Sequence, residues 1–151
     1  MNLQKLSFSN VIRLMNFYPP YLGAGVRVRV LDKDELIVRV DMNLNIFNKN
    51  YVGTHFGGSL YSMVDPFYML ILMRKLGRDF IVWDKKANIS FKRPGRENVY
   101  AIFEIKREKV AQIREEVGKL GKCEPVFEVS IKNQKGDVIA TVLKTLWVKK
   151  K

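Results

Sequence analysis

The pattern of hydrophobic and polar positions predicts strands in several parts of the chain. At residues 26–31 and 36–41 one set of apolar positions alternates with a second set that is mostly charged, with Leu31 and Ile37 as its apolar members. Alternation with a period of two is typical of strands with one buried face. Because Asp32-Lys33-Asp34 lies between the two segments, we expect them to form a hairpin. Further strand-like segments follow at residues 80–83, 87–91, 99–105, 125–131 and 138–148.

Three other parts of the chain favour helices. Residues 3–17 predict one or two short helical pieces, which Pro19-Pro20 should end. Residues 59–76 are apolar on nearly every face and would form a helix of roughly 27 Å, so we expect a curved sheet to wrap around them. Residues 109–120 carry one apolar stripe among charges, typical of a surface helix. The order of elements predicts an α+β fold with one central helix and about six antiparallel strands.

Length and composition indicate one domain over residues 1–151. A chain of 151 residues with 47% apolar residues can bury a sizeable core. Its single cysteine, Cys123, has no partner for an intramolecular disulfide, which fits a reducing compartment and a cytoplasmic location. The N-terminus has no secretory signal pattern, and the longest apolar run is broken by Asp65-Pro66, so we expect no membrane span.

The net charge of +12 favours anionic partners. Nucleic acid, an anionic membrane surface and a phosphorylated small molecule all fit that charge. The Lys and Arg residues are spread along the chain, apart from the tail Lys149-Lys150-Lys151. We therefore expect no specific nucleic-acid binding. With one His and one Cys, the sequence predicts no zinc site.

The most informative segment is residues 50–65. It reads Asn50-Tyr51-Val52-Gly53-Thr54-His55-Phe56-Gly57-Gly58, followed by Ser59-Leu60-Tyr61-Ser62-Met63-Val64-Asp65. A polar, glycine-rich loop runs directly into the apolar helix. This arrangement places free backbone N–H groups at a helix start and a carboxylate about two turns further along.

The element order and this loop resemble the hotdog fold, and in particular the small acyl-CoA thioesterases of the phenylacetate-degradation type. Their pattern is Asn-x-x-Gly-Thr-x-His-Gly-Gly with an acid seven residues after the second glycine. The chain follows this pattern without a gap. The segment Asn88-Ile89-Ser90-Phe91-Lys92-Arg93-Pro94 resembles the family's third strand and its terminal proline. The matching positions in the loop and helix are Asn50, Gly53, Thr54, Gly57, Gly58 and Asp65. One position departs: His55 stands one place earlier than the family's histidine.

The resemblance implies an acyl-CoA thioesterase that works as a homodimer or homotetramer. Coenzyme A would enter as part of the acyl-CoA substrate, with no separate cofactor. Asp65 would activate water or attack the thioester, and it would face the Gly57-Gly58 loop of another subunit. The backbone N–H of Gly57 or Gly58 would polarise the carbonyl. Residues 109–120 lie outside the family's minimal pattern.

Each proposed role has a structural alternative. Asp65 before Pro66 is also a good start for a second helix. The glycine pair could simply form the tight entry to the helix, Asn50 could be a turn former, and His55 could be a structural histidine.

The remaining candidate residues bind substrate in this interpretation. Thr54 would support the loop, Asp84 would hold the water or pair with Lys85, and Tyr68 would line the acyl site or belong to the core. Arg93 and Arg96 would bind the phosphates of coenzyme A or form a solvated turn. Two other functions remain open: a non-catalytic acyl-CoA or lipid-binding module on the same fold, and a nucleic-acid-associated basic protein.

Overall fold

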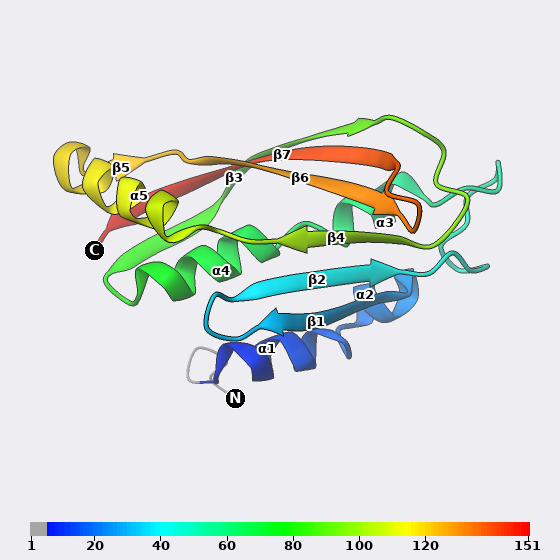
Figure 1. Ribbon diagram of the computed structural model, residues 1–151, viewed down its shortest axis with the longest axis horizontal. Helices are drawn as coiled ribbons and strands as arrows, with labels where there is room; N and C mark the ends of the chain where they lie inside the picture. Colours follow the sequence, from blue (N-terminus) through cyan, green and yellow to red (C-terminus); the bar gives the residue numbers. More distant parts are fainter. Residues whose placement is uncertain (1–5) are drawn as a thin grey trace.

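The computed structural model describes residues 6–151 and contains one curved antiparallel sheet with helices packed against it (Figure 1). The strands are hydrogen-bonded in the order β1-β2-β4-β6-β7-β3, and β5 adds to β7. Their bounds are β1 Val26–Asp32, β2 Ile37–Met42, β3 Phe80–Phe91, β4 Val99–Phe103, β5 Lys122–Cys123, β6 Val126–Asn133 and β7 Val138–Lys150. The helices are α1 Phe8–Met15, α2 Pro19–Ala24, α3 Gly57–Ser62, α4 Phe67–Leu76 and α5 Arg107–Leu120.

The strands predicted from alternation are confirmed, with two differences. The segments expected at 80–83 and 87–91 form one strand, β3, with an irregularity in its pairing between Asp84 and Lys86. The two-residue strand β5 was not predicted, because two residues are too short to show a period. The sheet therefore has seven strands instead of about six.

The helix predicted over residues 59–76 begins earlier and is interrupted. It starts at Gly57 as α3, stops at Ser62 and resumes at Phe67 as α4. Pro66 explains the break, because it has no N–H for a helical hydrogen bond. Asp65 does not cap α4: the N-cap residue is Pro66, and no side chain caps this helix. The interruption therefore leaves the Asp65 carboxylate available for contacts elsewhere.

At the N-terminus, Pro19 and Pro20 start a second helix, whereas the first helix already ends at Met15, before the prolines that were expected to end it. They occupy the first two positions of α2, where a missing N–H costs nothing. The side chain of Asn16, just after α1, accepts a hydrogen bond from the Val28 amide at 2.8 Å and donates one to the Val28 carbonyl at 2.9 Å. These two bonds fix the first helix on β1.

The core lies inside the curve of the sheet, around α4. Phe67, Ile71 and Leu72 of α4 are fully buried. The α5 helix, expected over 109–120, covers one end of the sheet with its apolar stripe and ends at Gly121, whose φ of 77° lies in the left-handed region. The core thus holds α4 against the strands and leaves α3 at its edge.

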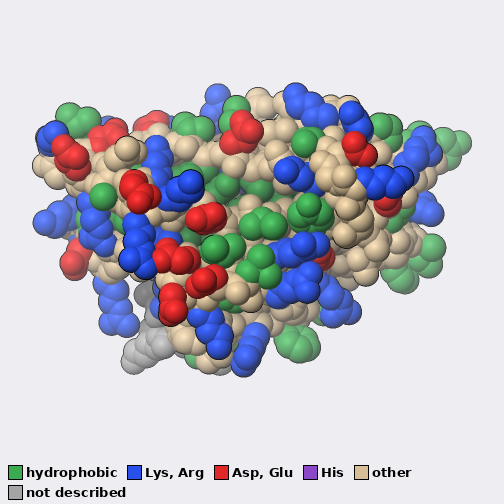
Figure 2. All heavy atoms as spheres, in the orientation of Figure 1, with side chains coloured by type: hydrophobic (Ala, Val, Ile, Leu, Met, Phe, Trp, Pro, Cys, Tyr) green, Lys and Arg blue, Asp and Glu red, His purple; other side chains and the backbone are tan. Residues whose placement is uncertain are grey.

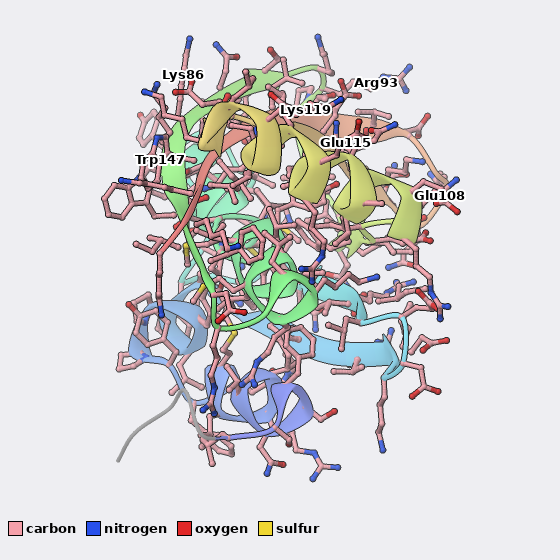
Figure 3. The ribbon with its side chains drawn as sticks, turned by 90° about the vertical axis from the view of Figure 1, so that its left-hand side faces the viewer. Lys86, Arg93, Glu108, Glu115, Lys119 and Trp147 are labelled. Atoms are coloured by element: carbon pink, nitrogen blue, oxygen red, sulfur yellow. The ribbon has the colours of Figure 1, made fainter. Side chains whose placement is uncertain are left out.

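The surface distributes its charge widely. Figure 2 shows Lys and Arg side chains scattered over one face, with acidic side chains between them. At the β3 edge, the Trp83 and Trp147 rings stack with centroids 4.9 Å apart. Figure 3 shows Trp147 and Lys86 projecting outward there. Trp83 is 55% exposed, so this edge carries a large aromatic surface.

Candidate functional site

The loop before α3 is shaped by Asn50. Its side-chain oxygen accepts hydrogen bonds from the amides of Val52 and Thr54, at 3.1 and 3.0 Å. Its side-chain nitrogen donates to the Thr54 hydroxyl at 2.9 Å and to the His55 carbonyl. Gly53 completes the turn with a φ of 80°. Both ends of the Asn50 amide are thus used inside the loop, so its role toward substrate stays a prediction.

His55 is packed beneath this loop. The residue is 3% exposed, and its Nε2 donates to the Glu97 carbonyl at 2.9 Å. Its Nδ1 is buried and has no hydrogen-bond partner among the described residues. Gly95 lets the ring pack closely, because a Cβ there would lie 3.1 Å from the His55 ring. The ring joins the loop to the 92–98 turn, and its catalytic role stays a prediction.

Gly57 and Gly58 present the backbone amides that the sequence predicted. They are the first two residues of α3, and neither amide donates a hydrogen bond within residues 6–151. The preceding residue, Phe56, has no capping side chain. A Cβ on Gly57 would lie 3.0 Å from the Phe91 ring, and one on Gly58 would lie 2.4 Å from the Phe56 ring. Glycine at these two positions therefore avoids close contacts with the two phenyl rings.

A cavity of about 470 Å³ opens beside Gly57. Its wall contains Gly57, the loop residues Asn50, Thr54 and His55, and the turn residues 91–96. Arg93 and Arg96 both line it, as the phosphate-binding hypothesis requires. Arg93 is paired with Asp137 at 2.8 Å, whereas Arg96 makes no ion pair with any described residue. The cavity thus combines the Gly57 amide, which donates no hydrogen bond within residues 6–151, with positive charge.

Asp65 lies in a different cluster. Its carboxylate pairs with the ammonium of Lys144 and accepts a hydrogen bond of 2.6 Å from the Tyr61 hydroxyl. Lys144 also pairs with Asp84 at 3.3 Å, so Asp84 contacts this ammonium and not Lys85. The structure therefore brings together the two acids that the sequence singled out, through a third residue.

The electrostatics of the cluster follow from burial and from these pairs. Burial raises the pKa of Asp84; the Lys144 ammonium opposes this shift, and the Asp65 charge adds to it. Burial alone would lower the pKa of Lys144. Its hydrogen bonds to Asp65 and Tyr61 and the two carboxylate charges outweigh that effect, so the pKa is raised.

Tyr68 lies in the core of the chain. Its ring stacks on Phe127 with centroids 4.8 Å apart, and its hydroxyl donates to the Glu128 carbonyl at 2.6 Å. Burial raises the pKa of Tyr68 to about 12, so the hydroxyl is neutral. These contacts account for Tyr68 by packing, and its contact with substrate stays a prediction.

Two groups of candidate residues are therefore separate within one chain. The cavity holds Gly57 but not Asp65. Asp65 lies eight positions after Gly57, beyond the end of α3 at Ser62. The Gly57 amide lines the cavity, whereas the Asp65 carboxylate contacts Lys144 and Tyr61.

Sequence reasoning missed Lys144 and Tyr61. The signal for Lys144 lies in the alternation of β7, where Ala140, Val142, Leu146 and Val148 are buried and Lys144 takes the position between them. A lysine on the buried face of a strand needs an acidic partner. Tyr61 lies four residues before Asp65, on the same side of a helical turn.

The sequence matches one known protein family over nearly its whole length. The family model described as "Domain of unknown function (DUF4442)" matches residues 6–148. The chain belongs to the DUF4442 family. A comparison of this DUF4442 protein with curated proteins gave no match.

Solved structures show the fold of this DUF4442 protein. A Pseudomonas aeruginosa protein of unknown function, described as a probable thioesterase, is 22% identical and has a TM-score of 0.73, with 85% of each chain covered. A Haemophilus influenzae thioesterase is 15% identical over 99% of this chain and 96% of its own, with a TM-score of 0.68. The Escherichia coli PaaI protein of the phenylacetic acid degradation operon is 17% identical over 96% and 93%, with a TM-score of 0.65. The DUF4442 protein therefore has the hotdog fold, as predicted.

Residues 6–151 contain no group of three His, Cys, Asp or Glu side chains arranged to hold a metal ion. None of the helices in this range combines the length and the apolar character that crossing a membrane requires.

The burial of His55 should make the free energy of unfolding depend on pH. Burial lowers the pKa of His55, and the hydrogen bond to Glu97 opposes that shift only in part. The unfolded chain therefore binds a proton more tightly than the folded one, and the stability contributed above the unfolded pKa of about 6.5 is lost as pH falls. We expect the free energy of unfolding to fall between pH 7.5 and 5.5, and to fall less in His55→Gln. Urea unfolding at both pH values measures the free energy of unfolding. An equal fall in that free energy for wild type and His55→Gln would contradict the prediction.

Proposed function

We propose that this protein is an acyl-CoA thioesterase whose site is completed by a second copy of the chain. The observation that carries the proposal is the Gly57 amide, which donates no hydrogen bond within residues 6–151 and lines a cavity that Arg93 and Arg96 also line. Likeness to thioesterases of the same fold supports the reaction class but not the substrate. The oxyanion that forms when a thioester carbonyl is attacked would accept a hydrogen bond from the Gly57 amide.

Asp65 supplies the second half of the proposed chemistry. A water molecule gives one proton to the Asp65 carboxylate while its oxygen forms a bond to the thioester carbon. The tetrahedral intermediate then collapses, the C–S bond breaks and the thiolate takes the proton back from Asp65. The products are a carboxylic acid and free coenzyme A. Direct attack by Asp65 is the other form of the same proposal.

A homodimer through the β3 edge would bring the two halves together. β3 ends the sheet, is 12 residues long and pairs on one side only among the described strands. Ala87 pairs with buried Lys144 and therefore shares its face of the sheet, yet Ala87 is exposed. A long uncovered edge is a template for pairing with another strand. In this proposal Asp65 of one subunit faces the Gly57 amide of its partner.

Arg93 and Arg96 are proposed to bind the phosphates of coenzyme A. Losing a charged hydrogen bond of about 1.5 kcal/mol or more corresponds to about tenfold or more in affinity. We expect Arg96→Ala to raise KM for an acyl-CoA about tenfold, and Arg93→Ala to raise it less because Asp137 already holds that side chain. KM for the matching N-acetylcysteamine thioester, which has no nucleotide, should hardly change.

The control for these variants is Arg27→Ala. Arg27 is exposed on β1, at the opposite edge of the sheet from β3. Both KM values should stay unchanged in this variant. If Arg96→Ala raised KM equally for the two thioesters, this result would contradict the phosphate-binding role.

A non-catalytic acyl-CoA-binding module is the second candidate function. It is favoured by His55, which stands one place before the histidine of the phenylacetate-type thioesterases, and whose Nδ1 is buried while its Nε2 donates to the Glu97 carbonyl. The deciding experiment is hydrolysis of short, long and aromatic acyl-CoAs, with released thiol as the readout and calorimetric binding of the same compounds alongside. Turnover identifies a thioesterase. Saturable binding without turnover across the panel identifies the module.

A further inference from the structure

Lys144 is the most unusual buried group in the described chain. It is 2% exposed and lies on β7 among apolar residues that face the helices. A buried ammonium is costly unless it is paired and its donors are satisfied. Its three donors have three acceptors: Asp65, Asp84 at 3.3 Å and the Tyr61 hydroxyl at 3.1 Å. The lysine is therefore the centre of a satisfied network of three residues from α3, the α3–α4 connection and β3.

The contacts at Asp65 are unequal between its two carboxylate oxygens. Lys144 and Tyr61 both donate to Oδ1. Oδ2 makes no hydrogen bond or ion pair with any residue of 6–151. The Asp65 side chain is 43% exposed, whereas that of Lys144 is 2% exposed. The network thus holds one oxygen of the carboxylate and leaves the other toward the open side.

We propose that Lys144 is a positioning residue for Asp65: it fixes Oδ1, so that Oδ2 is the oxygen that takes the proton from water, and Asp84 holds the ammonium during the reaction. This inference rests on the proposed function. When Oδ2 takes the proton, Asp65 becomes neutral and Lys144 loses one counter-charge. Asp84 remains as its anionic partner, so the buried ammonium is never left alone.

The charges around Asp65 come from four elements. Tyr61 lies on α3, Lys144 on β7, Asp84 on β3 and Tyr21 on α2. Burial raises the pKa values of Tyr61 and Tyr21, so both phenols are neutral at physiological pH. The charged groups of the cluster around Asp65 are therefore Lys144, which pairs with it, and Asp84, which pairs with the same ammonium.

The first test compares Lys144→Met with wild type on an acyl-CoA. A positioning role predicts a fall in kcat of about 10- to 100-fold with little change in KM, because the substrate itself does not touch Lys144. The matched control is Lys85→Met, which removes an exposed lysine from its ion pair with Glu124, a residue between β5 and β6. This control should retain wild-type kcat. A Lys144→Met enzyme with wild-type kcat would overturn the inference.

The second test is the pH dependence of kcat/KM. Loss of the cation in Lys144→Met should move the acidic limb about one pH unit or more to higher pH. Loss of the second acid in Asp84→Asn should move that limb to lower pH, because Lys144 then faces Asp65 alone. Shifts of opposite sign support the charge arrangement. Unchanged limbs in both variants would overturn it.

A third measurement separates this inference from the proposed function. In a crystal structure of Lys144→Met, we expect the Asp65 carboxylate to leave its wild-type orientation. If wild type hydrolyses no thioester but Asp65 turns in this variant, the proposed function fails and the positioning by Lys144 stands. If wild type is active, and Lys144→Met keeps both the wild-type Asp65 orientation and the wild-type kcat, the positioning role fails alone. Should Lys144→Met not fold, Tyr61→Phe removes the other Oδ1 donor and should lower kcat about three- to tenfold; unchanged kcat there contradicts the inference.

Discussion

Asp65→Asn should lower kcat for acyl-CoA hydrolysis by about 10²–10⁴-fold and leave acyl-CoA binding intact. The amide has nearly the shape of the carboxylate, and its oxygen can still accept the hydrogen bonds from Tyr61 and Lys144. It cannot take a proton from water, and it cannot attack a thioester. Steady-state hydrolysis with released thiol as the readout measures the loss, and calorimetry of an acyl-CoA measures the binding.

The control for this variant is Asp41→Asn. Asp41 is also an ion-paired carboxylate, 2.8 Å from Arg39 and 3.3 Å from Arg29, but it lies on β2. This change should leave kcat within about twofold of wild type. If Asp65→Asn also keeps its kcat, Asp65 is not the base, and the cluster around Lys144 is structural.

The fold could be predicted from the sequence because its strongest signals are local. Alternation along residues 26–31 and 36–41 gives the hairpin, and the apolar run after Gly58 gives the central helix. The break in that helix also has a local cause, Pro66, but its consequence is not local. The interruption turns Asp65 toward Lys144, which is 79 residues further along the chain. This contact forms only when the sheet places Lys144 of β7 against the connection between α3 and α4.

The candidate site was predictable in part, for the same reason. The loop residues Asn50, Thr54, His55 and Gly57 line one cavity because they are neighbours in the chain. Arg93 and Arg96 join them through His55, whose ring bonds to the Glu97 carbonyl and whose amide donates to the Gly95 carbonyl at 2.9 Å. A pattern of residue types cannot show such a link. The only sign of Lys144 in the sequence is a lysine at a position of β7 where the alternation predicts a buried apolar residue.

The second large effect concerns the Gly57 amide, which Gly57→Pro removes. We expect kcat to fall by about 10²–10³-fold, the usual cost of losing one oxyanion donor. Proline suits this place: Gly57 is the first residue of α3, and Phe56 before it has a ψ of 128°, which the residue before a proline prefers. Gly57→Ala is the matched control, because it adds a similar contact with the exposed Phe91 ring but keeps the N–H.

Mixing the two inactive chains then tests whether the site is shared between subunits. In a heterodimer of Asp65→Asn and Gly57→Pro chains, one of the two sites takes its Asp65 and its Gly57 amide from unmutated positions. With random pairing half of the dimers are mixed, so about a quarter of all sites should be active. Co-refolding the two variants and assaying hydrolysis measures this recovery. No recovery of activity, with mixed dimers present, would contradict a site that is shared between subunits.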